Sequence, residues 1–325
     1  MFWNIGGITQ KISDISFIDC IKSYDVIGLT ETWCSDIDLQ YIFPDYEMIM
    51  KTGDKISSSG RLSGGILVLI RKHFCNYKKW TKITENAVFI LFDRDLFGLD
   101  RDILYSCVYV QPEGSTWYDK LSPHCKNGIL LFQESLMDIV SNLPDVYILC
   151  GGDYNARTGS NPDFIEDDLL DYSENQNTSY WDFLTDYFNL KRFSADRTVN
   201  NFGKTLLDVC STFNIHIMNG RCGNDIEKGD FTYIGNNGAS LIDYIISSSV
   251  LFDYVIEFSI KSRTESDHLP ITLSVKTDLT RPTDASDKKV NTAYRFYWES
   301  NKVEQFRENL LSDRMVRFQP AGPLV

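Results

Sequence analysis

The sequence predicts an α/β sandwich, in which two β-sheets pack face to face and helices flank them. Short apolar runs rich in Val, Ile, Tyr and Phe are mixed with amphipathic stretches from residue 1 to about residue 276, and polar residues follow several of these runs. Many runs are joined by short turns, such as residues 235–240, which suits hairpins better than crossover helices. A doubly wound sheet is the alternative.

Strands are predicted where β-branched and aromatic residues dominate a short run. These runs are residues 2–5, 26–30, 65–70, 87–92, 103–110, 146–150, 215–219, 230–234, 241–246, 254–260 and 271–275. Helices are predicted where apolar residues recur three and four positions apart, at residues 12–23, 127–141, 179–188 and 203–213. The buried stripe of the second helix is predicted to be Ile129, Leu130, Phe132, Leu136, Ile139 and Val140.

The domain organisation follows from composition, because a length of 325 residues fits either one large domain or two modest ones. Residues 1–276 predict one domain, since no internal repeat or low-complexity tract interrupts them. Residues 277–294 predict a linker rich in Asp, Thr, Lys, Ser and Pro. Residues 295–325 follow, with one amphipathic helix predicted at residues 301–312.

The charge and the cysteines of the chain limit its partners. With 32 basic and 45 acidic residues, the net charge is −13 and the pI is near 4.8, which argues against a broadly basic surface for DNA. The eight cysteines include no Cys-x-x-Cys pair, so we expect reduced thiols in an intracellular protein and no zinc site. No apolar run approaches the roughly 18 residues of a membrane-spanning helix, so no membrane partner is expected.

Polar side chains stand where three of the predicted strands begin or end. Asp153 and Asn155 follow one apolar run, Glu31 follows another, and a Ser-Asp-His triplet at residues 266–268 lies beside a third. Acids, amides and a histidine at such positions suggest a metal-assisted phosphodiesterase, which must activate water and neutralise charge on the phosphate.

The residue types fit a magnesium site with a water-activating acid. Magnesium prefers oxygen ligands and takes one or two carboxylates, so Glu31 is a candidate ligand. The amide of Asn4 could also coordinate the ion, or it could cap the turn. Asp153 and Asn155 would face the same way if the strand geometry persists. Asp153 would then orient or deprotonate the attacking water, and Asn155 would hold a phosphate oxygen.

One of the four histidines, His268, completes the chemistry. A histidinium could donate a hydrogen bond to the scissile phosphate, although a lone histidine is more often structural. Asp243 lies in an otherwise apolar run, where an acid needs a partner. We therefore predict that Asp243 holds the tautomer of His268, and that Asp267 joins the metal site.

Together these motifs resemble the endonuclease/exonuclease/phosphatase superfamily over about residues 1–276. The resemblance rests on an ordered set of blocks that contain Asn4, Glu31, Tyr109, Asp153, Asn155, Thr232, Asp243 and Ser266-Asp267-His268. It is greatest to the apurinic-type endonuclease domain of non-LTR retrotransposons, because of the phrases Trp3-Asn4-Ile5-Gly6-Gly7, Leu29-Thr30-Glu31-Thr32-Trp33, Gly64-Gly65-Ile66-Leu67-Val68-Leu69-Ile70 and Asp153-Tyr154-Asn155-Ala156-Arg157.

The resemblance implies a fold and a metal. The fold would be a four-layer α/β sandwich of two mixed β-sheets flanked by helices, as in deoxyribonuclease I. Glu31, with help from Asn4 and Asp267, would bind Mg²⁺, or Mn²⁺ in its place. Some relatives carry a second polar ligand two residues after the asparagine, where this chain has Gly6.

The resemblance also implies roles for the remaining residues. The implied catalytic set is Asp153, Asn155, His268, Asp243 and Tyr109, in which Tyr109 shares the scissile phosphate with Asn155. The residues that would lie along the DNA backbone are Arg157, Thr232 and Ser266.

The leading interpretation is a magnesium-dependent endonuclease that nicks double-stranded DNA. The 3'-hydroxyl would prime reverse transcription by a reverse transcriptase domain of the same element, and the protein would act in the nucleus. Residues 295–325 would then be part of the spacer that leads to that domain. Two alternatives stay open: a phosphoesterase of the same fold acting on an inositol phosphate or a sphingolipid, and a non-catalytic module derived from a transposon.

Overall fold

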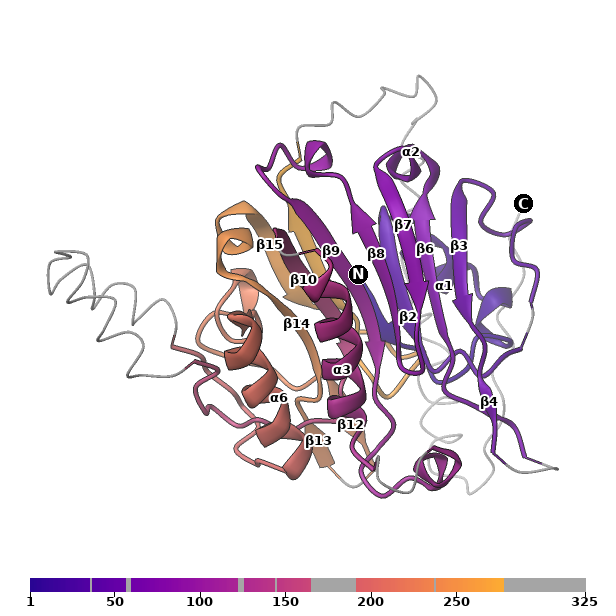
Figure 1. The fold of residues 1–325 in the computed structure, drawn as a ribbon. Coiled ribbons are helices and arrows are strands. Elements are labelled where there is room, and N and C mark those ends of the chain that lie inside the picture. The colour runs from indigo at the N-terminus through magenta and orange to yellow at the C-terminus, as the bar shows by residue number, and fades with distance from the viewer. Residues whose placement is uncertain are drawn as a thin grey trace, which may run out of the picture. The chain divides into compact units, whose positions relative to one another are not determined.

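Two mixed β-sheets form the centre of the computed structural model, which describes residues 1–35, 37–56, 60–121, 126–143, 145–164, 191–236 and 238–277 (Figure 1). Within these residues each large sheet has six strands. The order in the first sheet is β15 (Val255–Ile260), β16 (Ile271–Val275), β1 (Phe2–Asn4), β2 (Val26–Thr30), β6 (Ile66–Arg71) and β3 (Tyr46–Lys51). The order in the second sheet is β11 (Ile215–Ile217), β14 (Asp243–Ser248), β10 (Val146–Asp153), β9 (Asp102–Tyr109), β8 (Ala87–Phe92) and β7 (Lys78–Ile83).

Most neighbouring strands are antiparallel, as the short turns predict. In the first sheet β1 runs parallel to β2, with Asn4 opposite Thr30, and antiparallel to β16. In the second sheet β10 runs parallel to β9 and antiparallel to β14, so that Asp153 stands opposite both Tyr109 and Asp243. The register alone therefore brings three polar residues together at one end of the second sheet.

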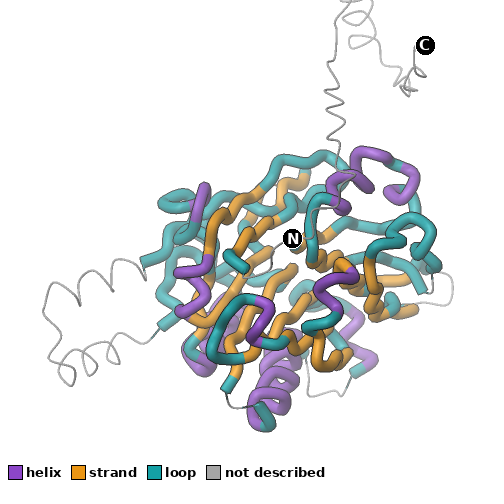
Figure 2. The backbone as a smooth tube through the Cα atoms, turned by 90° about the horizontal axis from the view of Figure 1, so that it is seen from above, coloured by secondary structure: helices purple, strands orange, loops and turns teal. Residues whose placement is uncertain are grey.

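Helices cover the outer faces of the two sheets. Figure 1 places α3 (Gly128–Ser141) and α6 (Asn201–Phe213) side by side over the second sheet, and Figure 2 places strands in the middle with helices mostly toward the edge. Helix α1 (Ile15–Lys22) packs on the first sheet, and α2 (Lys72–Cys75) follows β6. Short 3₁₀ helices are Lys11–Ser13, Arg94–Leu96, Thr116–Lys120, Gly223–Asp225 and Ser249–Tyr254. Two small hairpins are β4–β5 (Asp54–Lys55, Leu62–Ser63) and β12–β13 (Tyr233–Gly235, Gly238–Ser240).

Three hydrophobic clusters fill the spaces between the layers, because the central strands are apolar on both faces. On β1, Phe2 points to the cluster between the sheets while Trp3 points to the cluster beneath α1. On β8, Phe89 packs towards α3 and Val88 packs towards the first sheet. The four-layer α/β sandwich of two mixed sheets is therefore confirmed, and the doubly wound sheet is wrong.

The predicted elements differ from the observed ones mainly at their ends. The predicted helix at 12–23 is a 3₁₀ turn followed by α1, because the Asp14 side chain accepts hydrogen bonds from the Ser16 and Phe17 backbone amides and starts a new helix. The predicted strand at 230–234 is the shorter β12, which leads into a hairpin. Leu130, predicted in the buried stripe of α3, is 42% exposed.

Two strands of the large sheets were not predicted from the sequence. Strands β3 and β7 occupy the open edges of the two sheets, and both carry charged side chains that protect such edges from pairing. The predicted helices at 179–188 and 301–312, the predicted linker beyond residue 277, and residues 295–325 lie outside the described residues. Among the described residues, no helix has the length and apolar character needed to cross a membrane.

Candidate active site

The site begins where β10 ends in Gly151, Gly152 and Asp153. A side chain on Gly151 would place its Cβ 2.3 Å from the Phe2 ring of the other sheet. At Gly152 the backbone φ is +142°, and a Cβ would lie 1.9 Å from the Val108 carbonyl oxygen. Only glycine fits such a close approach. The two glycines therefore let β10 run between its neighbours and deliver Asp153 in a buried position, where it is 1% exposed.

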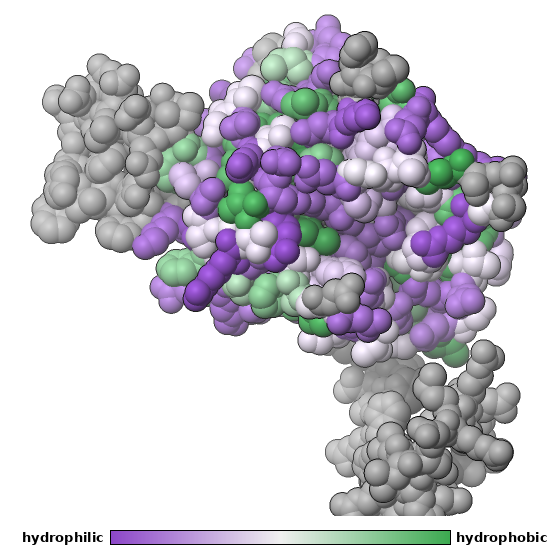
Figure 3. Space-filling view, turned by 90° about the horizontal axis from the view of Figure 1, so that it is seen from below, coloured by the Kyte–Doolittle hydropathy of each residue, from purple (hydrophilic) through white to green (hydrophobic). Residues whose placement is uncertain are grey.

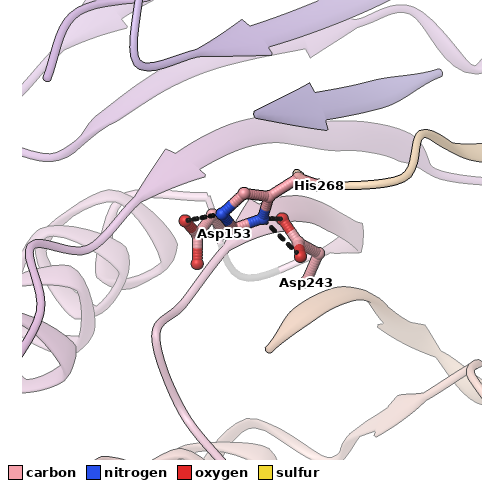
Figure 4. Close-up of side chains that lie close together, drawn as sticks. All are labelled: Asp153, Asp243 and His268. Atoms are coloured by element: carbon pink, nitrogen blue, oxygen red, sulfur yellow. Dashed lines mark hydrogen bonds and ion pairs between the residues drawn. The ribbon is translucent and has the colours of Figure 1, made fainter. Parts of the chain in front are cut away.

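An imidazole lies between two carboxylates at this point (Figure 4). The Nδ1 atom of His268 is 2.9 Å and 3.1 Å from the two carboxylate oxygens of Asp243, at the start of β14. Its Nε2 atom is 3.9 Å from Oδ2 of Asp153. The ring also packs edge-on against Tyr233, with centroids 4.9 Å apart. The predicted contact between Asp243 and His268 is therefore present. Asp153 lies on the other side of the ring, so that Asp153, His268 and Asp243 form a row.

The electrostatics of this row keep the ring charged. Burial alone would lower the pKa of His268, but the Asp243 charge and hydrogen bond, with Asp153 and Asp267 nearby, raise the pKa to about 10. Burial first, and then the charges of Asp243 and Glu31, raise the pKa of Asp153 to about 8, against the opposing effect of His268. At neutral pH His268 is a hydrogen-bond donor at both nitrogens.

Asp153 is held by amides on both sides. The Asn4 side-chain amide donates to Asp153 Oδ2 at 2.8 Å, and the Asn155 backbone N–H donates to Oδ1 at 2.9 Å. The Asn155 side-chain amide donates to the Val110 carbonyl at 2.8 Å. Asn155 has a backbone φ of 48°, in the left-handed region that asparagine adopts more readily than most residues with a side chain.

Glu31 follows β2 and faces the same space. Its backbone also has a positive φ, of 52°, and Oε1 accepts a short hydrogen bond from the Tyr109 hydroxyl at the end of β9. Burial, with the nearby charges of Glu31 and Asp153, raises the pKa of Tyr109 well above its usual range, so this phenol stays a donor. The structure thus links Tyr109 to the predicted metal ligand directly.

The residues predicted along the DNA lie in different settings. The Ser266 hydroxyl donates to the Asn4 carbonyl at 2.8 Å and accepts from the His268 backbone N–H at 3.1 Å. Thr232 is fully buried, and its hydroxyl accepts from the Asp243 backbone N–H at 3.0 Å. Both hydroxyls therefore hold the backbone segments that carry Asp243 and His268. Arg157 lines the open side of the site.

A cavity of about 560 Å³ joins these groups. Glu31, Asp153, Asn155, Asp267 and His268 all line it. Figure 3 views the end of the sandwich that carries the small hairpins, and its centre is mainly hydrophilic. The sequence analysis missed several lining residues as site residues: Trp33, Arg61, Glu113, Asn200 and Tyr233. Trp33 could have been identified from the sequence, because it ends the motif that contains Glu31. No motif in the sequence marks Arg61.

The donors around the cavity suit a hard divalent cation. Glu31, Asp267 and Asp153 supply carboxylate oxygens. The Asn4 amide nitrogen donates to Asp153, and its amide oxygen accepts from the Gly6 backbone N–H at 3.1 Å. The ligand atoms of Asp153, Asp243 and His268 also lie within 4.8 Å of one another and could hold an ion. The Asp243 carboxylate raises the pKa of His268, however, and an imidazole must lose its ring proton before that nitrogen can bind a metal. The oxygen donors near Glu31 are therefore the better site for the cation.

The chain is similar to known proteins in its sequence pattern and in its fold. The profile of the Endonuclease/Exonuclease/phosphatase family matches residues 1–268. No curated protein matches the chain. The 3'-5' exonuclease NExo from Neisseria meningitidis has a similar structure, with a TM-score of 0.53 at 12% identity over 85% of this chain and 98% of that chain.

Two further structures share the fold. The endonuclease domain of TRAS1, a telomere-specific non-LTR retrotransposon, has a TM-score of 0.51 at 13% identity, covering 84% of this chain and 95% of that chain. The AP endonuclease LMAP from Leishmania major has a TM-score of 0.54 at 13% identity, covering 85% and 86%. At these identities the similarity establishes the fold.

Proposed function

Because the chain belongs to the endonuclease/exonuclease/phosphatase family, we propose that it is a magnesium-dependent DNA endonuclease that cuts one strand of a duplex. One observation carries the proposal. The buried row of Asp153, His268 and Asp243 opens into the same cavity as the carboxylates of Glu31 and Asp267. A charged donor, a buried acid and an oxygen-rich cation site thus face one space, which is what hydrolysis of a phosphodiester needs.

Glu31, Asp267 and Asn4 would hold the cation, Mg²⁺ or Mn²⁺. When bound, it would neutralise charge that develops on the phosphate oxygens. Tyr109 donates to Glu31 and so fixes one carboxylate oxygen, leaving the other to face the cavity. The Asn4 amide is fixed too, since it donates to Asp153.

Asp153 is the acid in position to bind and deprotonate water. Its raised pKa brings it close to neutrality, where a general base is most effective. The Asn4 and Asn155 amides orient its two oxygens. Asn155, and Tyr109 beside it, would contact the scissile phosphate.

His268 serves as the charged donor. Asp243 accepts the hydrogen bond of Nδ1–H, so Nε2–H remains for an oxygen of the phosphate as negative charge develops. Asp243 acts through the ring and is a positioning residue. Arg157 would contact the DNA backbone from the rim, with Ser266 and Thr232 supporting the segments beneath it.

We further infer that the nick primes reverse transcription by a reverse transcriptase domain of the same element, in the nucleus. The resemblance of the motifs to non-LTR retrotransposon endonucleases supports this inference, as does the fold shared with the TRAS1 domain.

A plasmid assay tests the proposal. Supercoiled DNA with Mg²⁺ or Mn²⁺ should become nicked circles whose ends a DNA polymerase can extend, which reports a 3'-hydroxyl. Asp153→Ala and His268→Ala should each slow nicking by about 100-fold or more. Asp208→Asn, an exposed acid on α6, is the matched control and should cut normally.

Each alternative has its own outcome in this assay. Nicking that survives both substitutions contradicts the assigned site. Release of inorganic phosphate from an inositol phosphate, without nicking, favours the second substrate class. A folded protein that binds DNA but never cuts it is the non-catalytic module.

A further inference from the structure

The acidic charge of the protein raises the question of how its active site holds a polyanion. The net charge is −13, and each DNA phosphate brought to the cavity meets the carboxylates of Glu31, Asp153 and Asp267. Affinity for DNA therefore depends on the few cations at the cavity. Among the described lining residues, the arginines are Arg61 and Arg157.

The charge of Arg157 is largely offset. Its Nε donates to Asp196 Oδ2 at 2.7 Å, and a terminal nitrogen donates to Oδ1 at 2.6 Å. Asp196 is itself buried. This bidentate pair fixes the loop after β10, but it leaves fewer guanidinium N–H groups and less net charge for a phosphate.

Arg61 is in the opposite situation. Its guanidinium carbon lies 3.5 Å from the centroid of the Trp33 ring, so the planar group rests on the face of the indole. The Arg61 side chain is exposed, and among the described residues no carboxylate lies within ion-pair distance of it. Stacking leaves the N–H edge of the guanidinium open, which is the edge that binds phosphate in a bidentate way.

Trp33 is held rigidly as the platform. Its backbone φ is 52°, unusual for a bulky residue, and its N–H donates to the Gly64 carbonyl at 3.0 Å. A side chain on Gly7 would lie 2.6 Å from the indole Cε3 atom, so a glycine is needed for the ring to lie there. The strained backbone and the glycine fix the ring beside Glu31.

We propose that Arg61, stacked on Trp33, is the principal phosphate-binding cation of the site and grips a DNA phosphate that flanks the scissile one. Trp33 is a positioning residue that keeps the guanidinium at the rim. This inference rests on the proposed DNA endonuclease function, since it names the contact that overcomes the acidic charge.

The test measures the salt dependence of DNA binding. A fluorescent duplex is titrated with protein at several salt concentrations, with Ca²⁺ replacing Mg²⁺ to prevent cutting. Loss of one phosphate contact lowers the slope of log affinity against log salt by about 0.9. Arg61→Gln should show this decrease and a loss of affinity of about 10-fold at low salt. Trp33→Leu should lower both the slope and the affinity nearly as much. Trp33→Phe, which keeps an aromatic face, should restore part of the slope and part of the affinity.

Arg101→Gln is the matched control. Arg101 also stacks on an aromatic ring, at 5.5 Å from Tyr147, but it precedes β9, whereas the cavity lies beyond the other end of that strand. It should bind DNA like the wild type. Arg157→Gln should lower the melting temperature, with a smaller effect on the slope than Arg61→Gln.

The outcomes separate this inference from the function on which it rests. If the wild type binds and nicks DNA while Arg61→Gln keeps the wild-type slope, the inference is wrong and the function stands. An affinity loss without a change of slope, or a loss accompanied by a lower melting temperature, also overturns it. A wild type that neither binds nor nicks DNA overturns both.

Discussion

His268 shows how two acids on separate strands set the state of one ring. Asp243 alone would hold the tautomer of a neutral imidazole, as the sequence analysis predicted. Against the effect of burial, the charge and hydrogen bond of Asp243 raise the pKa of the ring most, and Asp153, at 3.9 Å, adds to them. The ring is therefore a charged donor across the physiological range of pH, and it need not take up a proton during the reaction.

Asp243→Asn tests this account. Removal of the charge should lower the pKa of His268 from about 10 towards its ordinary value, and should slow nicking by about 100-fold. A raised pKa contributes stability that is fully present below the unfolded pKa and is lost as pH rises through the folded value. Unfolding free energy should therefore fall between about pH 6.5 and pH 10 in the wild type and change less in the variant. NMR titration of the imidazole and urea unfolding at both pH values measure the two effects.

An unchanged His268 pKa in this variant would contradict the account. His268→Gln assigns the imidazole resonance, because the NMR signal that disappears from those of the four histidines belongs to His268.

At the scale of elements, β10 carries the site because of its two glycines. Gly152→Ala should destabilise the protein by more than about 3 kcal/mol, since the new Cβ would overlap the Val108 carbonyl of β9. Gly114→Ala is the matched control, because its φ is also positive, at +79°, but nothing lies within 4 Å of its Cβ. That control should cost only about 1 kcal/mol of backbone strain. Thermal unfolding followed by circular dichroism compares them, and equal costs would argue against the close approach.

Helix α6 is attached to the active-site loop by its N-cap. The Asn200 side-chain oxygen accepts from the Gly203 and Arg157 backbone amides, at 2.7 Å and 2.9 Å, and its amide donates to the Asn155 carbonyl at 3.2 Å. Asn200→Ala should cost about 1 to 2 kcal/mol in urea unfolding and slow nicking, because it removes both the cap and the link to Asn155. Asn200→Asp keeps the acceptor and should recover most of the stability. It should still bind DNA more weakly than the wild type, since it adds an acid to the cavity. Equal stability of the Ala and Asp variants would contradict a capping role.

The same elements explain what the sequence could predict. Central strands such as β2 and β8 are found at their predicted bounds, because burial on both faces leaves a nearly uninterrupted apolar run. Edge strands β3 and β7 carry Glu and Lys side chains, so neither apolar periodicity nor composition marks them. The pair of Asp243 and His268 followed from the cost of a buried acid. The contact of Arg61 with Trp33 could not be predicted, because it joins two loops that are distant in the sequence. Stacking on a ring face leaves no pattern in either loop's sequence.

At the scale of the whole molecule, the active site exists only when both sheets are packed together. The first sheet brings Asn4, Glu31 and the segment before β16 that holds Asp267 and His268, while the second brings Asp153 and Asp243. Four acids thus meet at one end of an already acidic protein. Charge repulsion there opposes folding, and a bound cation relieves it.

This balance predicts opposite effects of one substitution with and without magnesium. Without Mg²⁺, Glu31→Gln should be at least as stable as the wild type, because the Glu31 charge is one cause of the raised pKa of Asp153. With Mg²⁺, the wild type should gain about 2.7 kcal/mol at an ion concentration of 100 times Kd, while the variant gains little. The order of the two melting temperatures should therefore reverse when Mg²⁺ is added, and KCl of equal ionic strength should not reverse it. A Glu31→Gln protein that Mg²⁺ stabilises as much as the wild type would place the cation elsewhere. The group of Asp153, Asp243 and His268 would then be the remaining candidate, and His268→Gln would abolish the stabilisation instead.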